Sequence, residues 1–201
     1  MPKYVDPQKR MDEIVDASER LLSTGGFTNL TLRNLAKQMG GSITLVTHYF
    51  ESRAALVTAI LDRSLKETDA FIESLERISD ASERLRTALM WFLPADEVSL
   101  QAERAHIALV AHREAEPAIQ QFLDQVEPAM RRAITMAINE FVPPGELGGL
   151  VDILRVWTSG MILSAVEHPE VWTPEKQVHV LEQFLGHLQL PASYRADFVE
   201  A

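Results

Sequence analysis

The sequence predicts an all-α fold. Apolar residues recur at helical spacing along most of the 201 residues, whereas the alternating pattern of strands is scarce. Proline and glycine residues interrupt the helical runs at intervals that suit helix ends. Hydrophobic residues make up 46% of the chain and charged residues 24%, a globular balance that argues against disorder. This length is sufficient for a sizeable core in one domain or two.

The first helix is expected to begin at Asp6-Pro7. Aspartate suits the N-cap, and proline suits the first helical position because its missing N–H has no helical partner there. We expect Gly25-Gly26 to end this helix. One apolar face is predicted from the spacing of Ile14, Ala17, Ser18, Leu21 and Leu22.

Two short helices and a longer one are expected next. Thr31 suits the N-cap of the first, and Ser42 that of the second, which runs to about Phe50. Gly40-Gly41 forces a tight turn between them. Ser52 is expected to cap the longer helix. The supporting apolar positions are Leu32, Leu35, Ala36, Met39, Leu56, Ile60 and Leu61.

This arrangement of helices is typical of a helix-turn-helix, in which two short helices joined by a tight turn are braced by a preceding helix. The second short helix, residues 42–49, would then enter the major groove of DNA. The spacing alone also fits a small helical bundle without a role in DNA binding.

The remaining helices are predicted between prolines and cover residues 53–77, 81–93, 96–115, 117–141, 147–167 and 174–190. Pro128 is expected to kink the fourth of these. No linker separates the helix-turn-helix from the rest, so we place the domain boundary at the start of the longer helix. This gives a DNA-binding domain over residues 1–52 and a helical domain over residues 53–201.

The last two helices predict association with a second copy of the chain. The helix over 147–167 is apolar nearly all round, so it must be buried on several sides. Pairing the two helices across a two-fold axis would give a four-helix bundle, whereas a monomeric core is the alternative. The expected interface residues are Leu150, Leu154, Met161, Val178, Leu181, Leu185 and Leu188.

Charge is distributed unevenly along the chain. The net charge is −10, but residues 1–60 contain seven basic and six acidic side chains, giving +1. The remaining residues therefore contain 12 basic and 23 acidic side chains, and so account for −11. An acidic body would repel DNA and favour approach by the N-terminal end. This asymmetry permits DNA binding without proving it.

Residues 14–60, IVDASERLLSTGGFTNLTLRNLAKQMGGSITLVTHYFESRAALVTAI, resemble the DNA-binding domain of the TetR family of repressors. The resemblance runs without a gap and includes Gly26-Phe27, the Leu35-Ala36 pair and Tyr49-Phe50. It implies a regulator that binds double-stranded operator DNA as a homodimer. Two positions depart from the family pattern: Ile43 replaces a common lysine or other polar residue, and Thr47 replaces a tyrosine that contacts phosphate.

The expected DNA contacts come from both short helices and from the start of the longer one. One face of the second short helix presents Ile43, Thr44, Thr47 and His48. An apolar side chain on this face can contact a thymine methyl group. The resemblance implies that Arg33 contacts a base or phosphate and that Arg53 contacts a phosphate. Solvent exposure without a DNA contact is the alternative for the threonines and His48. The full expected set is Thr31, Arg33, Ser42, Ile43, Thr44, Thr47, His48 and Arg53.

Two later stretches, LPADEVSLQAERAHIALVAHREAEPAI and SGMILSAVEHPEVWTPEKQVHVLEQFL, resemble the C-terminal domain of BetI-type members of that family. The resemblance implies a domain that dimerises and binds a small-molecule effector, but such domains vary widely in ligand. A pocket is expected between helices. Alternatively, the tryptophans are ordinary core aromatics and the polar residues need no ligand. The expected lining residues are Trp91, Phe92, His106, Leu109, Arg113, Phe122, Met130 and Trp157.

Other functional classes find little support. The chain contains no cysteine, which excludes disulfides and thiolate zinc sites, and its six histidines are scattered. It has no phosphate-binding glycine loop, nucleophile elbow or HExxH motif, so we expect neither an enzyme nor a cofactor. The N-terminus is too polar for a signal peptide, and no apolar run approaches the roughly 18 residues of a membrane span. We therefore expect a cytoplasmic regulator without a membrane partner.

Two kinds of regulator remain open. The first is a repressor that a small molecule releases from a palindromic operator. The second is a DNA-binding regulator without an effector, controlled by a protein partner or by its abundance.

Overall fold

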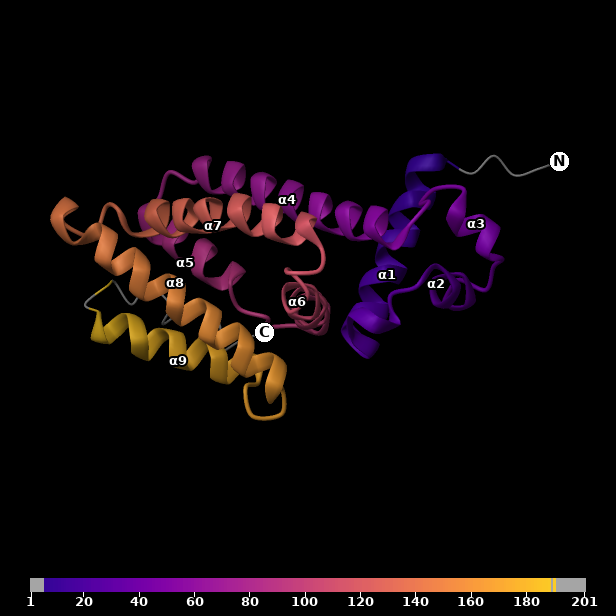
Figure 1. Ribbon diagram of the computed structural model, residues 1–201. Helices are drawn as coiled ribbons and strands as arrows, with labels where there is room; N and C mark the ends of the chain where they lie inside the picture. Colours follow the sequence, from indigo (N-terminus) through magenta and orange to yellow (C-terminus); the bar gives the residue numbers. More distant parts are fainter. Residues whose placement is uncertain (1–5, 189, 191–201) are drawn as a thin grey trace. The chain divides into compact units, whose positions relative to one another are not determined.

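The computed structural model describes residues 6–188 and Leu190, which are mostly helical and include no strand (Figure 1). The all-α prediction is therefore confirmed. Residues that lie close together in space form two compact units. Unit 1 is Met1–Lys66 with Gln101–Gln125, and unit 2 is Glu67–Leu100 with Val126–Ala201. The first division between the units lies within helix α4 (Arg53–Glu76), and the predicted domain boundary after residue 52 stays a prediction.

Helix α1 (Pro7–Asn29) begins as expected. The Asp6 carboxylate accepts a hydrogen bond from the backbone N of Gln8 at 2.9 Å, and Pro7 occupies the first helical position. The regular helix breaks at Gly26, within the predicted Gly25-Gly26 pair, and one further turn follows the kink within the bounds of α1. Gly26 has a φ of 67° and a ψ of −175°, a conformation that is essentially restricted to glycine.

Helices α2 (Leu32–Gln38) and α3 (Ile43–Thr47) lie close together beside α1, at the indigo end of the chain in Figure 1. Gly40 follows α2 with a left-handed φ of 66°. Its N–H donates to the carbonyl of Lys37 at 3.1 Å, and the N–H of Gly41 donates to that of Ala36 at 3.0 Å. These two bonds form a Schellman motif, which turns the chain sharply into α3.

The N-caps predicted at Thr31, Ser42 and Ser52 make a capping hydrogen bond in two cases out of three. The Thr31 hydroxyl oxygen accepts from the N–H of Asn34 at 3.1 Å, and the Ser52 hydroxyl oxygen accepts from that of Ala55, also at 3.1 Å. Ser42 occupies the N-cap position of α3, but its side chain makes no capping hydrogen bond. Helix α3 is also shorter than predicted, since it ends at Thr47 rather than near Phe50.

Unit 1 also contains residues of α6 (Glu97–Val110) and of α7 (Pro117–Ile138). Its core is built from aliphatic side chains, several of which the periodicity placed on inward faces. Those with no more than 1% of their surface exposed are Ile14, Ala17, Leu22, Leu30, Leu35, Val46, Leu56, Val57 and Ile119.

Unit 2 contains α5 (Ala81–Trp91), α8 (Pro144–Glu167), α9 (Pro174–His187) and parts of α4 and α7. Figure 1 shows α8 and α9 side by side, and the stacked rings of Trp157 and Phe184, with centroids 4.9 Å apart, join them. Pro128 lies inside α7, as predicted. Fully buried core residues include Leu75, Leu85, Leu89, Ile134, Leu154, Leu181 and Leu185.

Helix α8 is long and apolar enough to cross a bilayer by length and composition, with a mean hydropathy of 1.4 over a window of which 28% is buried. Its charged residues argue against a membrane location. Asp152 pairs with Arg131 of α7 at 2.5 Å, and Arg155 pairs with Glu127 of α7 at 2.9 Å. Charges are costly in hydrocarbon, and the inner side of α8 packs in the core of unit 2.

Arg84 of α5 ties together the ends of two other helices. Its Nε donates to the carbonyl of Met136 in α7 at 2.9 Å, and one terminal nitrogen donates to that of Ile78, just after α4, at 2.7 Å. The other terminal nitrogen pairs with Glu140. Carbonyls at helix ends have no partner within the helix, and the guanidinium supplies one. Only 12% of the Arg84 side chain is exposed.

We expect Arg84→Met to lower the free energy of unfolding by about 2–3 kcal/mol, because two partly buried carbonyls lose a charged donor. Chemical denaturation would measure this loss. Arg77→Met is the matched control, since Arg77 is exposed and its side chain makes no hydrogen bond or ion pair within the described residues. Equal stabilities of the two variants would contradict the assigned role of Arg84.

Candidate DNA-binding surface

The orientation of α3 follows from two buried side chains. Val46 is 0% exposed and Phe50, which follows the helix, is 4% exposed, whereas Leu45 and Tyr49 are half-buried. Because an α-helix turns every 3.6 residues, burial of this face directs the residues on the opposite face to solvent. These exposed residues are Ile43, Thr44, Thr47 and His48, the four that share the predicted face.

The exposed face of α3 combines apolar and hydroxyl groups. Ile43 is 48% exposed, which is unusual for a large aliphatic side chain. The Thr47 hydroxyl donates to the carbonyl of Thr44 at 3.4 Å, a long hydrogen bond that an external acceptor can replace. His48 packs edge-on against Tyr49, with ring centroids 4.9 Å apart. This packing restricts His48, so the face is partly preorganised.

Helix α2 brings two cations to one face. Arg33 and Lys37 are four residues apart and both are exposed, so they project from the same side of the helix. Within the part of the chain that the structure describes, neither side chain has an ion pair with a carboxylate. Lys37 was not among the predicted contacts, although its spacing from Arg33 is visible in the sequence. Thr31 is half-buried and Ser42 is exposed.

Arg53, the eighth predicted residue, has internal partners. One of its terminal nitrogens lies 3.2 Å from the Glu116 carboxylate, and its guanidinium carbon lies 4.5 Å from the centroid of the Phe27 ring. Phe27 in turn stacks on His112, with centroids 4.2 Å apart and ring planes at 20°. The sequence did not indicate this cluster, because its members lie up to 89 positions apart.

Arg63 is a second α4 cation with internal partners. It pairs with Asp16 of α1 at 2.5 Å and also with Glu19 of the same helix. Burial opposes the charged form of Arg63, but the hydrogen bonds and charges of Glu19 and Asp16 outweigh it and raise the pKa of the guanidinium. Arg63 therefore stays charged and joins α4 to α1.

The eight residues of the predicted effector pocket are divided between the units. His106, Leu109, Arg113 and Phe122 belong to unit 1, while Trp91, Phe92, Met130 and Trp157 belong to unit 2. Several are engaged with neighbours: His106 packs against Phe122, and Trp91, which is 41% exposed, stacks on Phe71. Leu109, Phe122, Phe92 and Met130 are buried.

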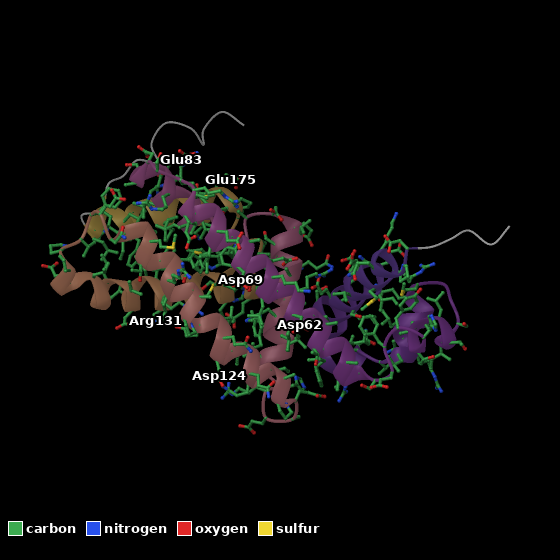
Figure 2. All side chains as sticks on the ribbon, turned by 90° about the horizontal axis from the view of Figure 1, so that it is seen from above. Asp62, Asp69, Glu83, Asp124, Arg131 and Glu175 are labelled. Atoms are coloured by element: carbon green, nitrogen blue, oxygen red, sulfur yellow. The ribbon has the colours of Figure 1, made fainter. Side chains whose placement is uncertain are left out.

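Unit 2 has a groove of about 470 Å³ between α4 and α7 that the sequence did not predict. Figure 2 labels Asp69 of α4, one of its lining residues. The groove is open to solvent and more polar than apolar, unlike the apolar pockets typical of small-molecule sites. Its lining consists of Asp69, Ile72, Glu73, Glu76, Pro128, Ala129 and Arg132.

The predicted dimer residues lie mostly inside unit 2. Leu154, Met161, Leu181 and Leu185 are at most 5% exposed, so they have almost no surface left for a second copy. Leu150, Val178 and Leu188 are half-buried. The apolar residues of α8 that do reach solvent are Ile153, Val156 and Leu163, at 50%, 74% and 46% exposure.

These exposed residues form a stripe with glycines. The stripe consists of residues that are spaced by three or four positions and share one side of α8: Gly149, Ile153, Val156, Gly160 and Leu163. A methyl group added at Gly149 or Gly160 would meet no atom of the chain within 4 Å. We call this set the α8 stripe.

Among the described residues, no group of three or more histidine, cysteine, aspartate or glutamate side chains suits a metal ion.

Comparison with known proteins places the chain in a family of regulators. Residues 14–60 match the family described as bacterial regulatory proteins, tetR family. Residues 81–190 match the C-terminal family of the BetI-type transcriptional repressors, and this second match alone covers more than half of the chain.

Similar curated proteins are described as HTH-type transcriptional regulators. BetI from Agrobacterium fabrum is 23% identical over 165 residues, which cover 81% of this chain and 80% of that protein. BetI from Klebsiella pneumoniae is 26% identical over 144 residues, or 70% and 72% of the two chains. PksA from Bacillus subtilis is 26% identical over 113 residues, and the match covers 56% of this chain and 55% of PksA.

Solved structures share the fold. A transcriptional regulator from Rhodococcus sp. Rha1 superposes with a TM-score of 0.77 at 22% identity, covering 89% of this chain and 96% of the other. A regulator from Saccharomonospora viridis in complex with choline has a TM-score of 0.78 at 18% identity, covering 90% and 97%. With two matching family regions and a shared fold, the chain belongs to the TetR family of bacterial transcription regulators and has a BetI-type C-terminal region.

Proposed function

We propose that this protein is a homodimeric repressor that binds a palindromic operator through α3 and is released from it by a small molecule. The exposed face of α3 carries this proposal, because buried Val46 and Phe50 hold four side chains outward on a helix-turn-helix. Arg33 and Lys37 add positive charge beside that face. A two-fold dimer reads two half-sites, which is why the operator is expected to be palindromic.

The chemistry of the face suggests which bases it reads. Ile43 and the methyl groups of Thr44 and Thr47 suit the thymine methyl in the major groove, while the threonine hydroxyls suit base edges or phosphates. The Arg33 guanidinium matches O6 and N7 of guanine. His48 and Ser42 are suited to backbone contacts, and the hydroxyl of Thr31 can reach a phosphate from the start of α2.

The proposed dimer surface is the α8 stripe, with the exposed side of α9 beside it. A glycine inside a helix costs roughly 1 kcal/mol relative to alanine, and the chain itself gives Gly149 and Gly160 no steric reason to be glycine. Close approach of a helix from a second copy supplies that reason, as small residues let two backbones meet. It would also cover Ile153 and Val156, whose exposure is otherwise unfavourable.

Release by a small molecule is supported by the BetI-type region and by the choline complex of the Saccharomonospora viridis regulator. An effector acts by its differential affinity for the DNA-competent and DNA-incompetent states, typically worth about 1–3 kcal/mol of coupling. The identity of the effector does not follow from an 18% identical neighbour. The second candidate, a regulator without an effector, is favoured by the burial of four of the eight predicted lining residues, Phe92, Leu109, Phe122 and Met130. Either regulator would act in the cytoplasm, where the operator is.

The function is tested by titrating the protein against DNA from upstream of its own gene and against an unrelated fragment of equal length, at physiological salt. Specific binding is expected to exceed nonspecific binding by about a thousandfold, with two protomers per site. Equal, weak binding to both fragments, followed by a genome-wide selection that enriches no sequence, would contradict the proposal.

Arg33→Ala is expected to weaken operator binding by about 1–3 kcal/mol per half-site and to relax preference at one base pair. Binding to the unrelated fragment should change much less. Lys66→Ala, which removes another exposed cation outside the helix-turn-helix, is the control and should leave the preference unchanged. An equal loss on both fragments would mean that Arg33 contacts only phosphate.

Val156→Glu is expected to convert the dimer to monomer at micromolar concentration, because it brings a charge to an apolar surface near the two-fold axis. Sedimentation velocity would measure the state of assembly. Val98→Glu is the matched control, as Val98 is 80% exposed at the start of α6, outside the α8 stripe. Both variants remaining dimeric would exclude the α8 stripe from the dimer surface.

A further inference from the structure

Arg53 is the one predicted phosphate contact whose guanidinium already pairs with an anion of the same chain, among the described residues. Its terminal nitrogen lies 3.2 Å from a carboxylate oxygen of Glu116, which is 63 positions later in the sequence. The Arg53 side chain is 43% exposed, so DNA can reach it, whereas the Glu116 side chain is only 15% exposed. The pair therefore joins an accessible cation to a sheltered anion.

Two further contacts fix the position of Glu116. It directly precedes Pro117, the first residue of α7, and its backbone N–H donates to the carbonyl of His112 at 3.2 Å. The His112 ring stacks on Phe27, and the same Phe27 ring lies beneath the Arg53 guanidinium. The carboxylate is therefore held beside Arg53 by packed rings and by a backbone turn, and not only by its own charge.

A carboxylate and a DNA phosphate recognise a guanidinium in the same way, as anions that accept hydrogen bonds from its N–H groups. A phosphate that binds Arg53 must either displace Glu116 or lie close to its negative charge. Both outcomes weaken DNA binding, since one loses the internal ion pair and the other places like charges together.

We propose that Glu116 is an internal competitor of the DNA phosphate for Arg53, and so limits the affinity of the protein for DNA. This inference rests on the proposed function, because it assumes that Arg53 faces phosphate in the complex. It extends that function by assigning a role in DNA affinity to a residue outside the helix-turn-helix.

The decisive variant is Glu116→Gln, which keeps the shape of the side chain but removes its charge. Glu114→Gln is the matched control: it removes the same charge two residues away, and the exposed Glu114 side chain has no ion pair within the described residues. Glu116→Asp is a second variant, which keeps the net charge but shortens the reach to Arg53. Thermal melting followed by circular dichroism checks that each variant is folded.

Glu116→Gln is expected to tighten binding to operator and to unrelated DNA by up to about fivefold per protomer, the upper range for an exposed ion pair. The salt dependence should also steepen, because one more phosphate contact releases more counterions. Glu114→Gln should give a smaller gain, and Glu116→Asp a gain without any change in net charge. In an Arg53→Gln background, Glu116→Gln should tighten DNA binding no more than Glu114→Gln does.

A gain from Glu116→Gln that equals that of Glu114→Gln, or that persists in the Arg53→Gln background, would overturn the proposal, since charge alone would explain it. Weaker DNA binding by a folded Glu116→Gln would also overturn it, because Glu116 would then position Arg53 for DNA. Phosphate contacts do not require a specific sequence, so unrelated DNA tests the competition even if no operator is found. A failure of operator recognition and a failure of this inference are thus distinguishable.

Discussion

The burial of Val46 and Phe50 is the constraint on which the DNA-binding surface depends. A helix of five residues has almost no stability of its own, because isolated helices shorter than about 12 residues are marginal in water. Helix α3 exists because its inner face completes the core of unit 1, and this packing sets the direction of its outer face. The Schellman turn at Gly40 and the Thr31 and Ser52 caps position the chain on either side of it.

The internal ion pairs decide which cations remain available to DNA. Arg63 joins α4 to α1 through Asp16 and Glu19, and Arg53 is held by Glu116. Arg33 and Lys37 of α2 have no such partner among the described residues. In a chain with a net charge of −10, unpaired cations on α2 are the source that we propose for the attraction of the N-terminal end to DNA.

Helix α8 has one buried and one exposed apolar side. Its inner side, which includes Leu154 and Met161, packs in the core of unit 2, while Ile153 and Val156 remain exposed. Apolarity all round predicted burial on several sides, but the described structure buries only the inner side. It did not indicate which side faces the core, because residues of both sides are equally hydrophobic and only the neighbouring helices distinguish them.

The sequence by itself determined the all-α class, most helix positions, the glycine turn between α2 and α3, and the face of α3 that is exposed. These features are local: they depend on residues within about four positions of one another, through helical periodicity, capping groups and glycine conformations. The tertiary structure decided the partner of Arg53, the division of the expected pocket residues between two units, and the exposed side of α8. These depend on contacts between residues far apart in the chain, such as Arg53 and Glu116, for which local patterns contain no information.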